Sequence, residues 1–163
     1  MFNIVTVCTG NICRSPMAEA LLRHEVEQAG LADHVAVSSA GVSDEEHGHG
    51  VDPRARDVLA ENGLELPEHR AHGITDRELA DADLLVAMTA DHARRLRERL
   101  PAGDAEKVRL MRSFDPAVAD TQTDLDIADP WYGGAEDFDA AWEQIRAATP
   151  GLVTWLRKRT DAR

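Results

Sequence analysis

The sequence predicts one α/β domain, residues 1–163, in which a four-stranded, mostly parallel sheet lies between two layers of helices in an α/β/α arrangement. Short apolar runs alternate with stretches of helical periodicity, a pattern typical of parallel strands that are covered on both faces. The length of 163 residues suits a single hydrophobic core. Apolar residues make up 43% of the chain and charged residues 29%, which is the balance of a globular protein.

Two strands and one helix are predicted near the N-terminus. Residues 4–7 are a β-branched run, and residues 35–39 form a second short strand. Between them, apolar side chains recur at helical spacing, and Gly30 stands where that helix would end. The apolar positions of this helix are Ala18, Leu22, Val26 and Ala29.

The middle of the chain adds two further strands and two helices. The strands are expected at residues 82–88 and 108–111, and the helices at residues 53–61 and 90–99. The signals that end the two helices are Asn62-Gly63 and Pro101.

The last part of the chain combines an irregular stretch with a helix. Residues 113–135 show neither period, and a loop of this length in a compact domain is usually functional. Pro150 lies within the following helical pattern, so we expect a break or kink there. The apolar face of that helix comprises Phe138, Trp142, Ile145, Leu152 and Leu156.

The charge balance limits the classes of partner. A net charge of −12 excludes general affinity for nucleic acid or for anionic membrane surfaces, because both depend on a basic field. It does not exclude a small anion, since a few backbone N–H groups and one arginine can bind a phosphate in an acidic protein.

Several features favour the cytoplasm. No segment approaches the roughly 20 apolar residues that a membrane span needs. Residues 1–10 lack a basic leader, and two cysteines five positions apart are typical of a reducing compartment. We therefore expect a cytoplasmic protein, with export by a route that needs no leader left open.

A histidine-rich segment raises the question of a metal site. Residues 45–50 read EEHGHG, but His47 and His49 are only two positions apart and no third ligand is suggested nearby. We interpret the segment as a solvated loop and predict neither a metal nor a cofactor.

The segment VCTGNICRSP, residues 7–16, is the candidate site. Cys8 falls where the first strand ends, and ligands of open α/β sheets bind at the carboxyl ends of the strands. Gly10 allows a tight turn, Pro16 suits the first turn of the next helix, and Ser15 is placed to be its N-cap. Backbone N–H groups and a helix N-terminus would then converge on one anion, so we predict a phosphate-binding loop after the first strand.

The spacing of Cys8 and Arg14 adds chemistry to this loop. A helix N-terminus and an arginine favour the thiolate form of a nearby cysteine, and the thiolate is the nucleophile. Arg14 can grip two oxygens of the same anion with its planar fork. Neither a Walker loop nor a dinucleotide loop is present, so the loop indicates phosphoryl transfer to sulfur. The alternative is a buried free cysteine beside a surface arginine.

The segment VCTGNICRSPMAEALLR resembles the N-terminal signature of the low-molecular-weight protein tyrosine phosphatases, and DPWYGGAEDF, residues 129–138, resembles their Asp-Pro-Tyr-Tyr-Gly-Gly loop. The resemblance covers essentially the whole chain, since further segments fall in the family's order: SSAGV (38–42), DPRA (52–55), EHRAHGIT (68–75) and RSFDPAV (112–118). It implies hydrolysis of phosphotyrosine in proteins, and of small aryl phosphates, through a phosphocysteine intermediate without a cofactor. The implied partner is a tyrosine-phosphorylated protein or peptide, and the enzyme a monomer or weak homodimer.

The resemblance also implies roles for three residues. Cys8 is the nucleophile, Arg14 binds the phosphoryl oxygens, and Asp129 is the general acid, a role that contributes about 10²–10⁴-fold. Asp124 and Asp126 are nearby rivals, but Asp129 is preferred because Asp-Pro followed by aromatic residues matches the family's motif.

Other residues match the phosphate-binding loop and its support. The remaining loop positions are Thr9, Gly10, Asn11, Ile12, Cys13 and Ser15, and the implied supporting network comprises Asn11, Ser15, Ser39 and His69. Ser15 could instead cap the helix, and His69 could be a solvated loop histidine. Cys13 matches a cysteine that protects the nucleophile through a reversible disulfide, or it is a small apolar filler.

Departures from the family's pattern concern the substrate pocket. Glu45 stands where the family usually carries an aromatic wall residue, so Trp131, followed by Tyr132, is expected to supply the wall. Thr9 stands where many members of the family have a leucine. Ile12 favours an aryl phosphate, because the related arginine phosphatases tend to carry threonine there. Phosphotyrosine is thus the first predicted substrate and phosphoarginine the second.

Two other functions are weighed against phosphatase activity. Arsenate reductases on the same scaffold relay a disulfide through additional cysteines, and this chain has none beyond Cys13. An inactive phosphate-binding module predicts loss of the cysteine, the arginine or the acid, and all three are present.

Overall fold

A computed structural model describes residues 1–121 and 124–161. The described residues form one sheet in the order β2-β1-β3-β4, and all of its strand pairs are parallel. The strands are β1 (Phe2–Cys8), β2 (Val35–Gly41), β3 (Leu84–Ala87) and β4 (Val108–Leu110). The predicted parallel sheet of four strands is confirmed.

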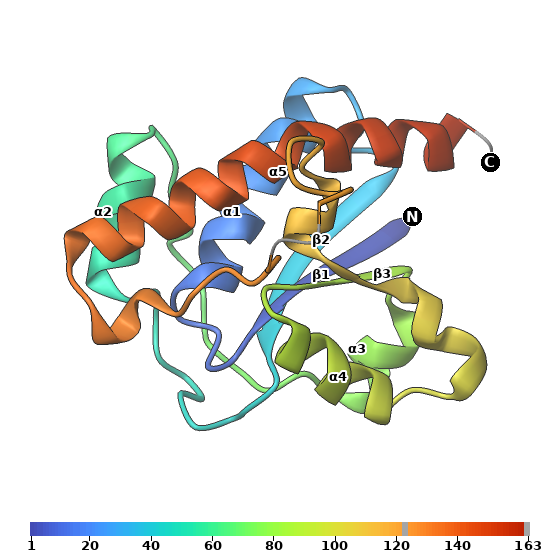
Figure 1. Cartoon of the computed structure of the whole chain (residues 1–163), viewed down its shortest axis with the longest axis horizontal. Helices are drawn as coiled ribbons and strands as arrows, with labels where there is room; N and C mark the ends of the chain where they lie inside the picture. Colours follow the sequence, from blue (N-terminus) through green and yellow to red (C-terminus); the bar gives the residue numbers. More distant parts are fainter. Residues whose placement is uncertain (122–123, 162–163) are drawn as a thin grey trace.

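Helices cover both faces of this sheet (Figure 1). On one side lie α1 (Arg14–Gln28), α2 (Pro53–Glu61) and the long α5 (Ala135–Asp161), and on the other lie α3 (Asp76–Asp81) and α4 (Ala90–Glu98). The three-layer arrangement is therefore confirmed. Within the part of the chain that the structure describes, no helix combines the length and apolar character needed to cross a membrane.

Alternating side chains explain why both faces of the sheet are buried. Ile4 and Val86 join the core beneath α1 and α5, whereas their neighbours Val5, Leu85 and Ala87 join the core beneath α4. Successive side chains of a strand point to opposite faces, so two-sided burial requires the near-continuous apolar runs of the sequence.

The predicted end of the first helix is also confirmed. Ala29 follows α1 as its C-cap, and Gly30 adopts a φ of 74°, which a side chain would disfavour. In the same way Asn62 caps α2 and Gly63 adopts a φ of 72°.

Of the break or kink predicted at Pro150, the break is wrong, because α5 runs through this proline as one helix. The kink stays a prediction. A proline inside a helix costs about 3 kcal/mol or more through the lost hydrogen bond and the ring's clash. The apolar face of α5 outweighs that cost, since Phe138, Ile145 and Leu152 are fully buried in the core that α5 shares with α1 and α2.

Short elements were missed between the predicted ones. Helix α3 has six residues and begins with a capping box of Thr75 and Glu78. Tight 3₁₀ turns occur at Ala102–Lys107, Met111–Phe114 and Pro130–Tyr132, the last two at the ends of the predicted long loop. Within that loop, Gln122 and Thr123 lie outside the described residues.

The strand order places the end of β1 at a topological switch. From β1 the chain passes through α1 to β2 on one side, and β3 joins β1 on the other side. Such a switch leaves a crevice at the carboxyl end of the strand, which is where the loop after Cys8 lies.

Candidate active site

The loop between β1 and α1 forms the floor of a pocket of about 240 Å³. Residues from three separate segments line it, and they include every predicted catalytic and wall residue. They are Cys8, Thr9, Gly10, Ile12, Cys13, Arg14, Glu45, Glu46, Asp129, Trp131 and Tyr132. Distant parts of the sequence thus meet at the carboxyl end of β1, where the site was predicted.

Ser15 is directed to the sulfur of Cys8 instead of capping the helix. Its Oγ lies 3.0 Å from Cys8 Sγ and accepts a hydrogen bond of 2.8 Å from the side-chain amide of Asn11. Since α1 begins at Arg14, Cys13 is the N-cap residue and Ser15 lies inside the first turn. The predicted N-cap role of Ser15 is therefore wrong, and its hydroxyl contacts the sulfur at 3.0 Å and the Ala40 carbonyl at 3.4 Å.

Asn11 has a φ of 64°, a conformation that is uncommon for a residue with a side chain. It is fully buried, and its amide also donates to Ser39 Oγ at 2.9 Å. Its backbone carbonyl accepts from His69 Nε2 at 2.7 Å. The predicted supporting residues Ser39 and His69 therefore both contact Asn11, and these contacts hold the strained turn of the loop.

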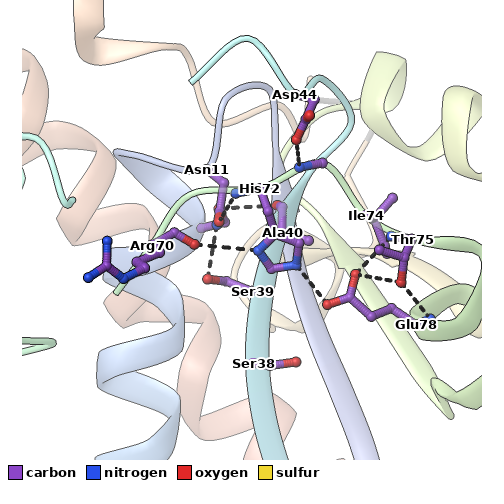
Figure 2. A network of polar contacts seen from close by, with 12 residues as sticks. Asn11, Ser38, Ser39, Ala40, Asp44, Arg70, His72, Ile74, Thr75 and Glu78 are labelled. Carbon is purple, nitrogen blue, oxygen red and sulfur yellow. Dashed lines mark hydrogen bonds and ion pairs between the residues drawn. The ribbon is translucent and has the colours of Figure 1, made fainter. Parts of the chain in front are cut away.

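The support of Asn11 extends to α3 (Figure 2). The backbone N–H of His72 donates to Asn11 Oδ1 at 3.3 Å, and the His72 ring lies 2.7 Å from Glu78 Oε1. Glu78 in turn accepts from the backbone N–H of Thr75 at 2.8 Å. A helix that sequence patterns missed thus helps to hold the phosphate-binding loop.

Arg14 is 3% exposed and reaches across the pocket. Its Nη1 donates to the carbonyl of Ile127 at 2.8 Å, and its Nη2 lies 3.5 Å from Asp129 Oδ2. Its Nε is buried and finds no acceptor among the described residues. Buried donors are normally paired, so this N–H is free to donate to a ligand of the pocket.

Asp129 is the acid that faces the pocket. Its side chain is 35% exposed, and its Oδ1 accepts from the N–H of Trp131 at 3.0 Å. The rivals are occupied elsewhere, since Asp126 accepts from the backbone N–H of Ala90 at 2.7 Å and Asp124 from that of Asp126 at 2.9 Å. Of these three carboxylates, only Asp129 lines the pocket.

Two buried groups, one that lines the pocket and one next to it, have shifted pKa values. Burial, followed by the charge of Arg14, lowers the pKa of His92 to about 4, so its ring is neutral at pH 7. Its Nε2 lies 2.8 Å from Thr9 Oγ1. Burial, followed by the nearby charge of Asp52, raises the pKa of Cys13 and keeps it as a thiol.

The histidines of residues 45–50 bond to neighbouring acids. His47 Nδ1 lies 3.0 Å from Asp44 Oδ1, and His49 Nδ1 lies 2.6 Å from Glu46 Oε2, all four side chains being at least partly exposed. Across residues 1–121 and 124–161, no group of three or more His, Cys, Asp or Glu is arranged to hold a metal ion.

The geometry can be compared with known families. The family model described as low molecular weight phosphotyrosine protein phosphatase matches residues 3–162. The chain belongs to this family. The resemblance inferred from the sequence motifs is thus confirmed, and the fold is that of the low molecular weight phosphatases.

Related phosphatases cover nearly the whole chain. A low molecular weight protein-tyrosine-phosphatase of Streptomyces coelicolor is 46% identical over 163 residues, which cover 99% of this chain and 98% of that protein. A tyrosine phosphatase structure from Entamoeba histolytica has a TM-score of 0.89 at 26% identity and covers 97% of this chain and 98% of that chain. An arginine phosphatase from Geobacillus stearothermophilus has a TM-score of 0.81 at 34% identity, covering 98% and 95%.

Three residues that line the pocket or contact its lining are not indicated by sequence patterns. Ile127 contributes a backbone carbonyl, for which no side-chain motif exists. His92 lies in a charged helical stretch, where nothing distinguishes a histidine that turns inward. Glu46 directly follows the predicted Glu45 and could have been found by extending that segment by one residue.

Proposed function

We propose that this chain hydrolyses phosphotyrosine in proteins, and small aryl phosphates, through a phosphocysteine intermediate. The observation that carries the proposal is that Cys8, Arg14 and Asp129, from three segments, line one pocket. We further propose that residues 1–163 act as a single phosphatase domain, in line with the family match over residues 3–162.

The first step transfers the phosphoryl group to sulfur. The Arg14 guanidinium and the loop N–H groups bind the phosphoryl oxygens, and the Cys8 thiolate attacks phosphorus. The bond between phosphorus and the phenolic oxygen breaks, and Asp129 donates a proton to that oxygen as it leaves. The products are a phosphocysteine and a neutral tyrosine.

The second step releases phosphate. The Asp129 carboxylate accepts a proton from a water molecule, whose oxygen attacks phosphorus, and the S–P bond breaks. The electron pair returns to Cys8 Sγ as a thiolate, which the hydroxyl of Ser15 at 3.0 Å can stabilise. Asp129 is thereby protonated again for the next turnover.

An aromatic wall supports an aryl substrate. Trp131 is 46% exposed and Tyr132 is 84% exposed, and their rings meet edge to face with centroids 4.9 Å apart. Exposed aromatic faces beside a phosphate site can stack on the ring of phosphotyrosine. Ile12 adds an apolar contact at the pocket floor, whereas the charged Glu45 offers none.

We also infer the setting in which the enzyme acts. Its substrate is a tyrosine-phosphorylated protein or peptide, without a metal or other cofactor and without a nucleic acid. Two free cysteines agree with the cytoplasm, with export by a leaderless route left open. We propose a monomer or weak homodimer, and a dimer that persists at nanomolar concentration in sedimentation velocity would contradict this.

Two variants test the mechanism. Cys8→Ser should abolish hydrolysis of aryl phosphates. Asp129→Ala should slow it by about 10²–10⁴-fold for phenyl phosphate, whose leaving group needs a proton, and by less for p-nitrophenyl phosphate. A chelator should leave the wild-type rate unchanged. Undiminished turnover by Cys8→Ser would falsify the phosphocysteine mechanism.

Phosphoarginine is the second candidate substrate, because an arginine phosphatase shares the fold at 34% identity. Matched peptides that carry either phosphotyrosine or phosphoarginine decide between the two. We expect a higher kcat/KM for phosphotyrosine, and Ile12→Thr should reduce the difference by enlarging and polarising the pocket floor. A wild-type preference for phosphoarginine would reverse the assignment.

A further inference from the structure

Arg54, in the first turn of α2, contacts the segment that carries Asp129. Its Nη1 donates to the backbone carbonyls of Trp131 at 3.2 Å and of Gly133 at 3.0 Å. These carbonyls belong to the acid loop, defined here as residues 129–133, which begins at Asp129 and contains the 3₁₀ turn Pro130–Tyr132. One guanidinium thus holds the loop on both sides of Tyr132.

The guanidinium of Arg54 is itself fixed in place. Its Nε and Nη2 each donate to one carboxylate oxygen of Asp52 at 3.1 Å, and its Cζ lies 4.5 Å from the centroid of the Phe138 ring. The planar fork therefore makes a bidentate ion pair, stacks on an aromatic face and still offers Nη1 to the carbonyls. Arginine can do this and lysine cannot, because the donors of an ammonium all sit on one nitrogen and form no planar fork.

Asp52 connects the same assembly to the nucleophile loop. Its backbone N–H donates to the carbonyl of Ile12 at 2.9 Å. Its side chain is only 9% exposed and accepts the backbone N–H of Arg54 at 2.9 Å as the N-cap of α2. A continuous path of hydrogen bonds thus runs from the phosphate-binding loop through Asp52 and Arg54 to the acid loop.

No helix or strand among the described residues leads into the acid loop, so contacts such as those of Arg54 must hold it in place. The described residues that precede it, 115–121 and 124–128, contain no helix or strand, and among the described residues the ion pair of Asp129 is with Arg14, at 3.5 Å. A general acid must reach the leaving oxygen within hydrogen-bond distance, and a misplacement of about 1 Å can cost about 10²-fold in rate.

We propose that Arg54 is a positioning residue that fixes the general acid against the nucleophile loop. This proposal rests on the proposed role of Asp129. Arg54 does not line the pocket, so it acts through the backbone of the acid loop and not on the substrate.

The test compares two leaving groups in three variants. Arg54→Gln should lower kcat/KM by about 10–10²-fold for phenyl phosphate and by less than about fivefold for p-nitrophenyl phosphate, because only the poor leaving group depends on a well-placed acid. Arg54→Lys should fall between Arg54→Gln and the wild type. The control Arg56→Gln, on the same helix, should change neither rate, since Arg56 donates to the Val51 carbonyl and not to the acid loop.

A double variant separates positioning from general damage. In an Asp129→Asn background, Arg54→Gln should add less than about a twofold loss, because the acid that it positions is already absent. The proposal would be overturned if Arg54→Gln lowered kcat/KM equally for phenyl phosphate and p-nitrophenyl phosphate. It would also be overturned if Arg54→Gln caused its full loss of activity in the Asp129→Asn background. If Arg54→Gln does not yield folded protein, Arg54→Lys gives the same comparison. Intact phenyl phosphate hydrolysis by Asp129→Asn alone would instead contradict the proposed function.

Discussion

At the scale of single residues, the hydroxyl of Thr9 links the buried His92 to Arg14. Thr9 Oγ1 lies 2.8 Å from His92 Nε2 and 3.5 Å from Arg14 Nη2. His92 is 3% exposed, and among the described residues its Nδ1 has no hydrogen-bond partner. An unpaired acceptor is tolerated better than an unpaired N–H, which favours the tautomer that donates from Nε2 to Thr9.

His92 should make the stability of the fold depend on pH. Its pKa falls from 6.5 to about 4, so between these values the unfolded chain binds a proton that the folded protein does not. The contribution of His92 is therefore complete above pH 6.5 and is lost as the pH falls towards 4. The total loss is about 3 kcal/mol, at about 1.4 kcal/mol per pH unit.

Urea unfolding at pH 7, 6, 5 and 4.5 measures this effect. The charged groups that face His92 are Arg14, Asp91, Arg95 and Asp129, and all remain in His92→Gln, whose amide can still donate to Thr9. The free-energy difference between wild type and His92→Gln should shrink as the pH falls. A difference that stays constant with pH would show that His92 is already protonated or is accessible to solvent.

Cys13 should protect oxidised Cys8 from further oxidation by forming a disulfide with it. Burial keeps Cys13 as a thiol, so peroxide is expected to oxidise Cys8 first, to a sulfenic acid that Cys13 then attacks with loss of water. Mass spectrometry of oxidised wild type should find a Cys8–Cys13 disulfide, and Cys13→Ala should accumulate sulfinic and sulfonic acid at Cys8. Persistent sulfonic acid at Cys8 in the wild type would indicate that Cys13 is only a buried filler.

Residues differ in how far the sequence foretells their contacts. The grouping of Cys8, Arg14 and Asp129 in one pocket could be predicted, because two motifs of known order specify it. Whether Ser15 caps α1 or contacts the sulfur of Cys8 could not be predicted. Both roles use the same hydroxyl, and the exact first residue of α1 decides between them. Arg54 lies in the segment DPRA, which resembles the family's pattern. Its role could not be predicted, because its partners are backbone carbonyls, and any residue type can supply these.

At the scale of elements, α5 is held to the rest of the fold by aromatic and backbone contacts. Trp155 meets Phe2 of β1 and Phe114 edge to face, with ring centroids 5.9 and 5.8 Å apart. At Gly151, one residue after the proline, the helix packs directly on the backbone carbonyl of Phe114. These contacts explain how α5 tolerates Pro150 without breaking.

Gly151→Ala should therefore destabilise the protein, although alanine is the better helix former by about 1 kcal/mol. The added Cβ would overlap with the Phe114 carbonyl oxygen, which is backbone and cannot rotate away. We expect the free energy of unfolding to fall by about 1–3 kcal/mol, as in other overpacked cores. Gly103→Ala is the control, because nothing lies within 4 Å of its Cβ position and a change within about 0.5 kcal/mol is expected. A gain in stability for Gly151→Ala by urea unfolding would contradict this packing.

Element boundaries were predictable where one physical signal dominates. The apolar strands and the glycines after α1 and α2 fall where the pattern places them, because burial and a positive φ admit few alternatives. Helix α3 was missed since six residues are too short to show a helical period. No break occurs at Pro150, because tertiary packing of α5 overrides the low helix propensity of proline.

At the scale of the whole molecule, the negative charge extends to the mouth of the pocket. The chain carries 30 acidic and 18 basic residues, excluding histidine, and the pocket lining adds Glu45, Glu46 and Asp129 to the single Arg14. Glu45 is exposed. Basic residues beside the phosphotyrosine of a peptide should therefore be attracted to this rim, and acidic residues repelled.

Peptides of matched length should reveal this preference. With lysine or arginine beside the phosphotyrosine, kcat/KM should exceed that for aspartate or glutamate by roughly tenfold at low ionic strength. The ratio should shrink in 0.5 M salt, because exposed charges are screened there over a few ångströms. Glu45→Gln should reduce this ratio of kcat/KM values by about two- to fivefold, the effect of one exposed charge pair.

The control variant is Glu27→Gln. It removes the same charge at the end of α1 that lies away from the loop, and it should leave the ratio unchanged. If both variants lower the ratio equally, the preference arises from net charge, whereas a ratio near one would show that the acidic rim does not select the substrate.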